Sequence, residues 1–402
     1  MITQYRMSAL LALILLASPL AEAGKPDGKP GPGGTRPPPN PDIVYMSANS
    51  RTVNGPAIRG FTFQNNTDTE LAKAKNGRGK GSIAWSPDGQ SYAWIEIVSE
   101  TSSILTAAPG QAPRVIYSAQ WGDASRPYPG GYNSDQLAWG PGCSPGTSVL
   151  VFQGYGGPNL SPQGIYAIDS PDPEGAPPVP RLVLDEVNAS AFAISSDGKY
   201  LAFDNGYGTG EKVWLVPLCS TPSAKVALLE WDDFGAAVYR SACDDDPTTS
   251  ACDCDGNPEK QCIDYPSQAV ISIDWSRDNS RLALSVVVGP DPDYPWRDLR
   301  IAYLNYSTSG LSTASVLGVK NIKQDSAFGA ASSEHSPQWG PSSGEACQRI
   351  AFSQSAGASD GSSINGRRLF LMDVSDWLGT ESCQIETPLE LGAREPRAID
   401  WK

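Results

Sequence analysis

The sequence predicts an all-β fold, a six-bladed β-propeller whose ring is closed by strands from both ends of the chain. A short phrase occurs six times, the last copy lying at the end of the chain, and each complete phrase leads into a turn and is followed by further short apolar runs. Four short strands per repeated unit is the organisation of a propeller blade. Glycine and proline number 40 and 35, and no long amphipathic helical pattern lies among them. Short strands between turn residues are typical of an all-β domain.

The repeated phrase is clearest at residues 83–89, where it reads Ile-Ala-Trp-Ser-Pro-Asp-Gly. Asp or Ser can brace a loop by side-chain hydrogen bonds to the backbone, and Gly or Asn supplies the positive φ that a type I turn with a bulge needs. Each phrase is therefore expected to form the first strand of a hairpin and its turn. The other copies, some weaker, lie at 137–142, 192–198, 273–279, 337–341 and 399–401.

The remaining strands of each blade follow these phrases. Second strands are expected at 92–94, 149–152, 201–203, 282–284 and 350–352, and third strands at 104–105, 165–168, 213–216, 301–304 and 369–372. Fourth strands are clearest at 115–117, 182–184 and 226–229. The last phrase, 399–401, has no such followers, and the N-terminal runs at 43–46, 58–63 and 70–73 supply them. Closing the ring inside one shared blade leaves no loose terminal blade.

Along each first strand, an apolar position is followed by a small or polar one, as expected of a strand that packs against a neighbouring blade. The position two residues before the Trp site is apolar throughout: Ile83, Leu137, Phe192, Ile273, Pro337 and Ile399. The position directly before it is small or polar: Ala84, Ala138, Ala193, Asp274, Gln338 and Asp400. We therefore expect the Trp residues of these phrases to belong to the core.

The N-terminal segment predicts export. Residues 1–23 read as a signal peptide, with Arg6 ahead of a short apolar run and Ala21-Glu22-Ala23 after it. Residues 24–40, rich in Pro and Gly, are expected to form a disordered tether, and residues 41–402 the propeller. We expect a periplasmic protein, or alternatively a secreted one, with no membrane span. The net charge of −14 argues against a nucleic-acid partner.

Trp85-Ser86-Pro87-Asp88-Gly89, followed by an apolar-Ala-aromatic strand at 92–94, resembles the repeat of the TolB-like propellers. The resemblance covers residues 41–402, although this chain carries cysteine-bearing insertions that the simple repeat lacks. What the resemblance implies is a protein-binding role in the bacterial envelope, with partners docking on a propeller face or into its funnel.

The sequence contains few of the residues that common nucleophilic mechanisms of catalysis require. His335 is the single histidine, and a Ser-His-Asp triad would have to use it. His335 is expected at the beginning of a first strand, as a turn or funnel-rim residue. Asp274 and Asp400 occupy equivalent positions of blades four and six, near the channel, and Gln338 holds the same position in blade five. Such paired carboxylates can act as acid and base, bind an ion or a cationic ligand, or simply be solvated.

The eight cysteines of an exported chain indicate disulfides. The acidic insertion 243–262 is too poor in apolar residues to form a core, so we expect Cys243, Cys252, Cys254 and Cys262 to pair among themselves. Asp253 and Asp255 there loosely match a calcium loop, and zinc held by the four thiols is the other alternative. Turns one-to-two and three-to-four of a blade share a face, which predicts the pairs Cys143–Cys219 and Cys347–Cys383.

These observations predict an exported, monomeric, non-catalytic scaffold without a cofactor, which binds a protein or peptide partner. Two alternatives remain. One is a glycan or small-ligand binding protein or enzyme that uses Asp274, Gln338, Asp400 and His335 in the funnel. The other is a calcium-binding propeller that uses Asp253 and Asp255.

Overall fold

A computed structural model describes most of the region predicted to be the propeller. The described residues are 41–47, 57–73, 82–123, 125–130, 136–155, 163–172, 175, 177–185, 189, 191–204, 213–219, 225–229, 270–288, 296–305, 315–321, 332–340, 348–356, 365–374, 389–391 and 396–401. The predicted signal peptide and tether (1–40) and the acidic insertion 243–262 lie outside them. Within the described ranges, no helix is long and apolar enough to cross a membrane.

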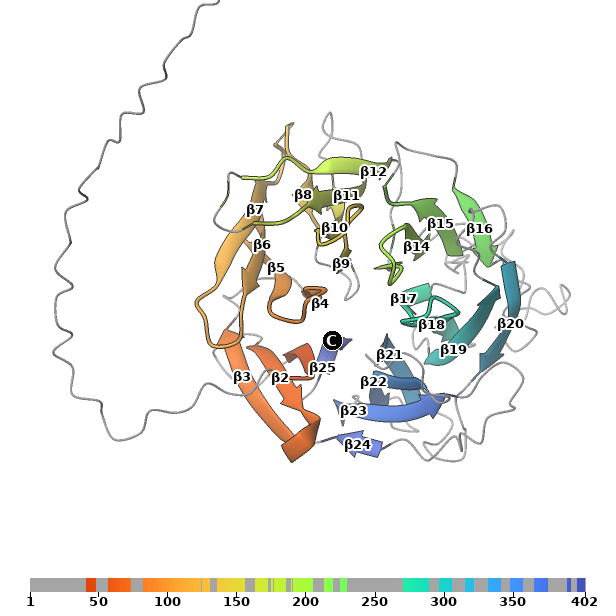
Figure 1. Cartoon of the computed structure of the whole chain (residues 1–402). Helices are drawn as coiled ribbons and strands as arrows, with labels where there is room; N and C mark the ends of the chain where they lie inside the picture. The colour runs from red at the N-terminus through yellow and green to blue at the C-terminus, as the bar shows by residue number, and fades with distance from the viewer. Residues whose placement is uncertain are drawn as a thin grey trace, which may run out of the picture. The chain divides into compact units, whose positions relative to one another are not determined.

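Six antiparallel sheets of four principal strands surround a central axis in the described residues (Figure 1). Blades one and two are β4 (Ile83–Trp85), β5 (Tyr92–Val98), β6 (Thr101–Ala107) and β7 (Arg114–Gln120), then β9 (Leu137–Pro141), β10 (Ser148–Tyr155), β11 (Gly164–Asp169) and β12 (Arg181–Asp185). Blades three and four are β13 (Phe192–Ile194), β14 (Tyr200–Asp204), β15 (Val213–Pro217) and β16 (Val226–Leu229), then β17 (Val270–Trp275), β18 (Arg281–Val288), β19 (Trp296–Asn305) and β20 (Ser315–Asn321).

Blades five and six complete the ring. They are β21 (Ser332–Trp339), β22 (Gln348–Ala356), β23 (Asn365–Val374) and β24 (Leu389–Leu391), then β25 (Pro396–Trp401), β1 (Ile43–Ser47), β2 (Ala57–Thr62) and β3 (Thr67–Lys73). Two elements were not predicted: the 3-10 turn η1 (Phe63–Asn65), and β8 (Tyr128–Pro129), which pairs with the far end of β10.

Blade six joins the two ends of the chain, as the sequence predicts. β25 pairs antiparallel with β1, with Trp401 opposite Ile43 and Ile399 opposite Tyr45. These four side chains belong to one buried cluster that also contains Phe61 of β2 and Leu369 of blade five. The C-terminal strand is therefore both the inner strand of blade six and part of the core between blades five and six.

The turn after the first strand has the same construction in blades one, three and four. Ser86, Ser195 and Ser276 each accept, on Oγ, the backbone N–H of the residue five positions later, at 2.9, 3.0 and 2.9 Å. Each serine hydroxyl also donates to the aspartate two residues on. The residue after that aspartate has positive φ: 63° at Gly89, 71° at Gly198 and 59° at Asn279. The bracing role predicted for Ser and Asp, and the φ predicted for Gly or Asn, are confirmed.

The core lies between blades, and most Trp residues of the repeated phrase are part of it. Trp85, Trp275, Trp339 and Trp401 expose 7% of their surface or less. Trp139 of blade two is half-buried, and blade three has Ile194 at the equivalent position. The large side chains that recur in the phrase therefore serve mainly to pack one blade on the next.

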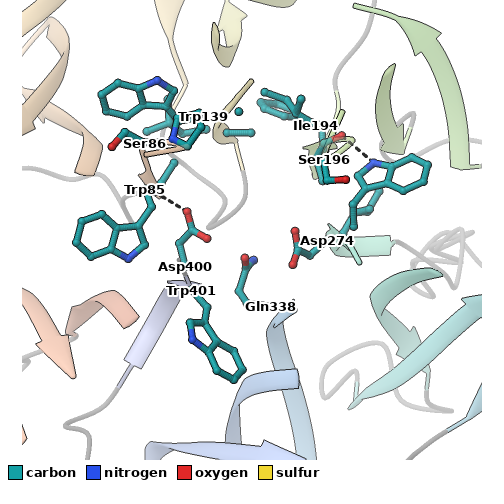
Figure 2. A pocket seen from close by; sticks show the side chains of 18 of the residues that line it. Trp85, Ser86, Trp139, Ile194, Ser196, Asp274, Gln338, Asp400 and Trp401 are labelled. Carbon is teal, nitrogen blue, oxygen red and sulfur yellow. Dashed lines mark hydrogen bonds between the residues drawn. The ribbon is translucent and has the colours of Figure 1, made fainter. Parts of the chain in front are cut away.

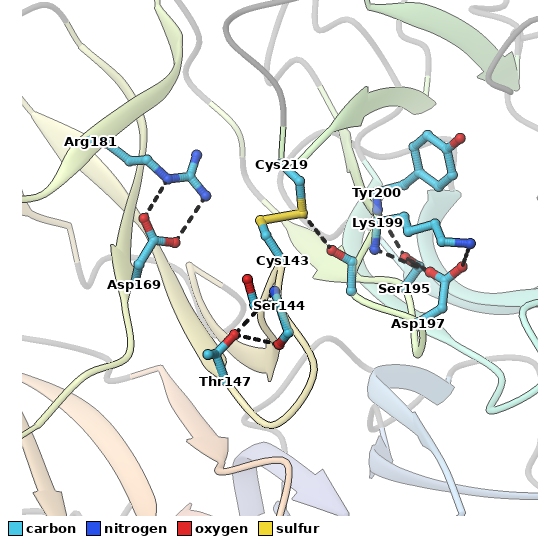
Figure 3. Close-up of a disulfide and its surroundings, with 11 residues drawn as sticks. Cys143, Ser144, Thr147, Asp169, Arg181, Ser195, Asp197, Lys199, Tyr200 and Cys219 are labelled. Atoms are coloured by element: carbon cyan, nitrogen blue, oxygen red, sulfur yellow. Dashed lines mark hydrogen bonds and ion pairs between the residues drawn. A yellow bond between two sulfur atoms is a disulfide. The ribbon is translucent and has the colours of Figure 1, made fainter. Parts of the chain in front are cut away.

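A disulfide links Cys143, between β9 and β10, to Cys219, which follows β15 (Figure 3). The Cα atoms are 5.4 Å apart, and 76 positions separate the two residues in the chain. This is the pair that the shared face of the two turns predicts. Cys347 and Cys383, the other predicted pair, lie outside the described residues, as do the four cysteines of the acidic insertion.

Replacing Cys143 and Cys219 together by serine is expected to lower the free energy of unfolding by about 2–4 kcal/mol, because the bond closes a long loop in the unfolded chain. Urea unfolding of the wild type and of the double variant, under oxidising conditions, measures this difference. A loss below 0.5 kcal/mol, a value well under that range, would count against a stabilising role for the bond.

Candidate functional site

The six first strands line a central channel, with a cavity of about 440 Å³ between them (Figure 2). Each strand runs through its apolar position, its small or polar position and its Trp site before it turns outward. The turns that follow β4, β9, β13 and β17 lie at one end of the channel, here called the hairpin face, which carries Ser86, Ser196 and Arg277. The sequence register therefore brings equivalent residues of all six blades to one place.

The two halves of the channel differ in polarity. Blades one to three contribute Ala84, Ala138 and Ala193, and blades four to six contribute Asp274, Gln338 and Asp400. Figure 2 shows the two carboxylates and the amide directed into the same space, with Gln338 between the aspartates. Three of the predicted site residues are thus brought together by the fold.

Both carboxylates are used to join blades. Asp400 Oδ2 accepts the backbone N–H of Trp85 at 2.5 Å, and Asp274 Oδ2 accepts the backbone N–H of Trp339 at 2.7 Å. The first bond joins blade six to blade one, and the second joins blade four to blade five. A carboxylate that accepts a backbone N–H makes a strong, charge-assisted hydrogen bond. The aspartates are therefore part of the ring, and simple solvation does not describe them.

Asp274 sits in an environment that disfavours its charge. Burial raises the pKa of Asp274 to about 8, and the negative charge of Asp400 acts in the same direction. The Trp339 N–H and the positive charge of Arg277 oppose the shift. Desolvation and a like charge both favour the neutral acid. Near neutral pH the polar half of the channel can therefore take up or release a proton at Asp274.

Arg277 spans two blades at the hairpin face. Its backbone belongs to the turn of blade four, and its Nη2 donates to the carbonyl of Trp401 in blade six at 3.2 Å. Its own carbonyl accepts the Ser196 hydroxyl of blade three at 2.6 Å. Sequence reasoning missed Arg277 as a site residue. The available signal was its place in the phrase, where blade one has Pro87 and blade three has Ser196.

The structure does not describe the side chains of the other predicted site residues. The backbone of His335 lies within β21, opposite Ser353, and not in a turn, while its side chain is outside the described part of the structure. Asp253 and Asp255 also lie outside it. Among the residues that are described, no group of three or more His, Cys, Asp or Glu side chains could hold a metal ion. Calcium binding by the acidic insertion stays a prediction.

Two carboxylates and an amide on one wall, facing three alanines on the other, can chemically hold a cation that has an apolar side. A pair of carboxylates can also divide the roles of acid and base when their pKa values differ. Here, however, each carboxylate already accepts a backbone N–H, which fixes its position in the ring.

No family model matches the chain, and no curated protein does. Solved structures with a similar fold include TolB from Acinetobacter baumannii, at 12% identity and a TM-score of 0.44, covering 89% of this chain and 66% of that protein. The putative TolB from Agrobacterium tumefaciens is similar at 12% identity and a TM-score of 0.45, over 89% and 99%. The periplasmic gluconolactonase PpgL of Pseudomonas aeruginosa is similar at 10% and 0.45, over 89% and 97%.

At such identities the likeness concerns the fold and transfers no activity.

Proposed function

We propose that this protein is an exported, non-catalytic propeller that binds a protein or peptide partner in the bacterial envelope through an exposed aromatic anchor on blade one. The observation that carries the proposal is Trp121, which directly follows β7 and is 49% exposed. Trp121 lies on the face where the first strands begin, opposite the hairpin face, because β7 runs antiparallel to β6 and ends beside the β5–β6 turn.

Trp121 is held in place although it is exposed. Its backbone N–H donates to the carbonyl of Glu100 at 2.7 Å, and its ring packs edge-on against Tyr128 with the centroids 5.2 Å apart. Val98, 41% exposed, lies at the same end of the β5–β6 hairpin. A rigid aromatic side chain loses little entropy on binding, and such residues dominate the energetics of protein interfaces. Trp121 and Val98 are together called the blade-one patch.

We propose a non-catalytic function because the polar residues of the channel already have structural roles. Asp274 and Asp400 each accept a backbone N–H from the next blade, so both carboxylates have a structural duty. The sequence holds one histidine, which limits the nucleophilic routes. The export that the proposal requires is supported by the signal-like segment 1–23 and by the Cys143–Cys219 disulfide.

Replacing Trp121 by alanine is expected to weaken binding of a partner recovered from envelope extract at least 10-fold, the effect of removing an interface anchor worth about 2 kcal/mol. The wild type, immobilised as the mature chain, is used to recover and identify the partner, and the affinity of the purified partner is then measured for each variant. Leu317→Ala is the matched control, because Leu317 is an exposed apolar residue, 54% exposed, on blade four.

The proposal fails if the wild type recovers no partner reproducibly. It also fails in its present form if Leu317→Ala and Trp121→Ala reduce the affinity equally, since the contact would then not be centred on the blade-one patch. A melting temperature equal to that of the wild type shows that Trp121→Ala leaves the fold intact.

A further inference from the structure

The surroundings of Trp121 indicate the chemistry of its partner: we propose that the blade-one patch receives an arginine side chain, with the guanidinium stacked on the Trp121 ring and paired with the Glu100 carboxylate. An apolar residue beside that arginine would contact Val98. This inference rests on the proposed function, because it names the kind of partner segment that the blade-one patch would bind.

The Trp121 ring lacks the cation that the half-buried Trp214 has. Lys225 Nζ lies 4.7 Å from the centroid of the Trp214 ring. Among the described residues, no Lys or Arg lies over Trp121, and the ring contact that Trp121 makes there is its edge-on packing against Tyr128. A cation over an exposed aromatic ring contributes about 0.5–1 kcal/mol. The exposed indole of Trp121 can therefore receive a cation from a partner.

Glu100 lies next to Trp121 and supplies a negative charge at the blade-one patch. The turn between β5 and β6 contains Glu100, and the register that pairs Thr101 with Gln120 brings Glu100 opposite Trp121 at the next position. The Glu100 carbonyl accepts the Trp121 backbone N–H at 2.7 Å, so the two residues are neighbours at the end of the hairpin. Glu100 is exposed, and its carboxylate forms no ion pair or hydrogen bond with a described residue. A partner that covers the patch therefore meets this charge.

The other charged residues close to Trp121 in the chain already interact with one another. Asp123 accepts a backbone N–H at 2.9 Å and a hydroxyl at 2.7 Å, both from the serine two positions later. The positive charge of Arg126 also acts on Asp123, and the Arg126 guanidinium lies 5.0 Å from the centroid of the Tyr117 ring. Among the described residues beside Trp121, Glu100 therefore remains as the charge available to a partner.

An arginine fits an exposed indole beside a carboxylate better than the other kinds of side chain. Its guanidinium is planar and weakly hydrated, so it can stack on the indole while its N–H groups donate to the carboxylate. An acidic residue would be repelled by Glu100, and an apolar residue would cover that carboxylate without a hydrogen bond, which is costly. The net charge of −14 also attracts a basic segment.

The test is a fluorescence-anisotropy titration of the mature chain with a fluorescein-labelled peptide that repeats Val-Arg-Val-Gly. Two further peptides carry lysine, or the uncharged arginine analogue citrulline, in place of arginine. Salt is kept at about 0.15 M to screen long-range attraction. We expect saturable binding of the arginine peptide and about 3-fold weaker binding of the lysine peptide. The citrulline peptide should bind about 10-fold more weakly, the effect of losing a charge-assisted hydrogen bond.

Two variants locate the arginine on the protein. Glu100→Gln is expected to weaken binding of the arginine peptide about 3- to 5-fold, because it removes the carboxylate and keeps the backbone carbonyl that Trp121 uses. Trp121→Leu keeps an apolar side chain and is expected to weaken binding by a similar factor, because the cation no longer faces an indole. Asp169→Asn, which removes an exposed carboxylate from the ion pair with Arg181, is the matched control and should leave the affinity unchanged. Melting temperatures equal to that of the wild type show that the variants fold.

The proposal is overturned if the arginine peptide does not bind, if the lysine or citrulline peptide binds as tightly, or if Glu100→Gln and Asp169→Asn behave alike. Such a result leaves the proposed function standing as long as the affinity of the recovered partner still depends on Trp121. A recovered partner that binds Trp121→Ala as tightly as the wild type overturns the proposed function instead, whatever the peptides do.

Discussion

Deletion of residues 396–402 is expected to abolish cooperative folding of the propeller. This segment contains the whole of β25, the inner strand of blade six, which pairs with β1. Its loss removes Ile399 and Trp401 from the core between blades five and six and the Asp400 bond to the Trp85 N–H. It also leaves β1 as an unpaired inner edge, and an exposed edge strand favours aggregation. Loss of the thermal transition followed by circular dichroism measures the effect.

Two milder variants test whether the loss of cooperative folding is caused by the removal of β25. Deletion of Lys402 alone should leave the melting temperature unchanged, because Lys402 lies beyond the end of β25. Ile399→Ala, a core truncation at a residue that is 2% exposed, is expected to cost about 2–5 kcal/mol and to leave the transition cooperative. A 396–402 deletion variant that melts like the wild type would contradict closure of the ring by β25.

The stability of the wild type is expected to contain a component that falls as pH rises from about 4 to 8, and Asp274→Asn should remove it. The pKa of Asp274 in the fold is raised to about 8, above the value of ~3.9 of an unfolded aspartate. The unfolded chain therefore loses this proton first as pH rises. The contribution of Asp274 to the free energy of unfolding has its full value below about pH 4. It falls by up to about 1.4 kcal/mol per pH unit as pH rises, and it becomes constant above about pH 8.

The measurement is urea unfolding at several pH values between 4 and 9, with wild type and variant compared at each. The free energy of unfolding of Asp274→Asn should rise relative to that of the wild type across this interval, because the uncharged amide cannot ionise. Asp169→Asn is the control for the removal of an exposed carboxylate, because Asp169 forms a surface ion pair with Arg181. A constant difference between Asp274→Asn and wild type would show that Asp274 does not titrate in this range.

The architecture could be predicted from the sequence because the residues that specify each turn and each strand lie close together in the sequence. The turn after a first strand depends on Ser, Asp and Gly or Asn within six residues, and the structure builds these turns as predicted at Ser86, Ser195 and Ser276. The antiparallel order of the strands puts turns one-to-two and three-to-four of a blade on the same face, which is why Cys143 could be paired with Cys219. The alternation along the first strands places Asp274, Gln338 and Asp400 beside the channel.

The contacts of those residues were not predictable in the same way. Asp274 reaches a backbone N–H that is 65 positions away, and Asp400 one that is 315 positions away. Arg277 and Trp401, 124 positions apart, meet across the hairpin face without any pattern that joins them. His335 was expected at the beginning of a first strand, as a turn or funnel-rim residue, and its backbone lies within β21, which begins earlier than the repeated phrase.

The sequence by itself determined the number of blades, the closure of the ring through Ile399, Asp400 and Trp401, and the side of each first strand that faces the channel. Local turn signals and period-two alternation identify the strands, and the incomplete strand sets at the two ends of the chain together account for the sixth blade. Only the tertiary structure decided that Asp400 and Asp274 accept hydrogen bonds from the backbone of Trp85 and Trp339 in other blades. Those bonds depend on how closely neighbouring blades approach, which is set by the packing of side chains from distant parts of the chain.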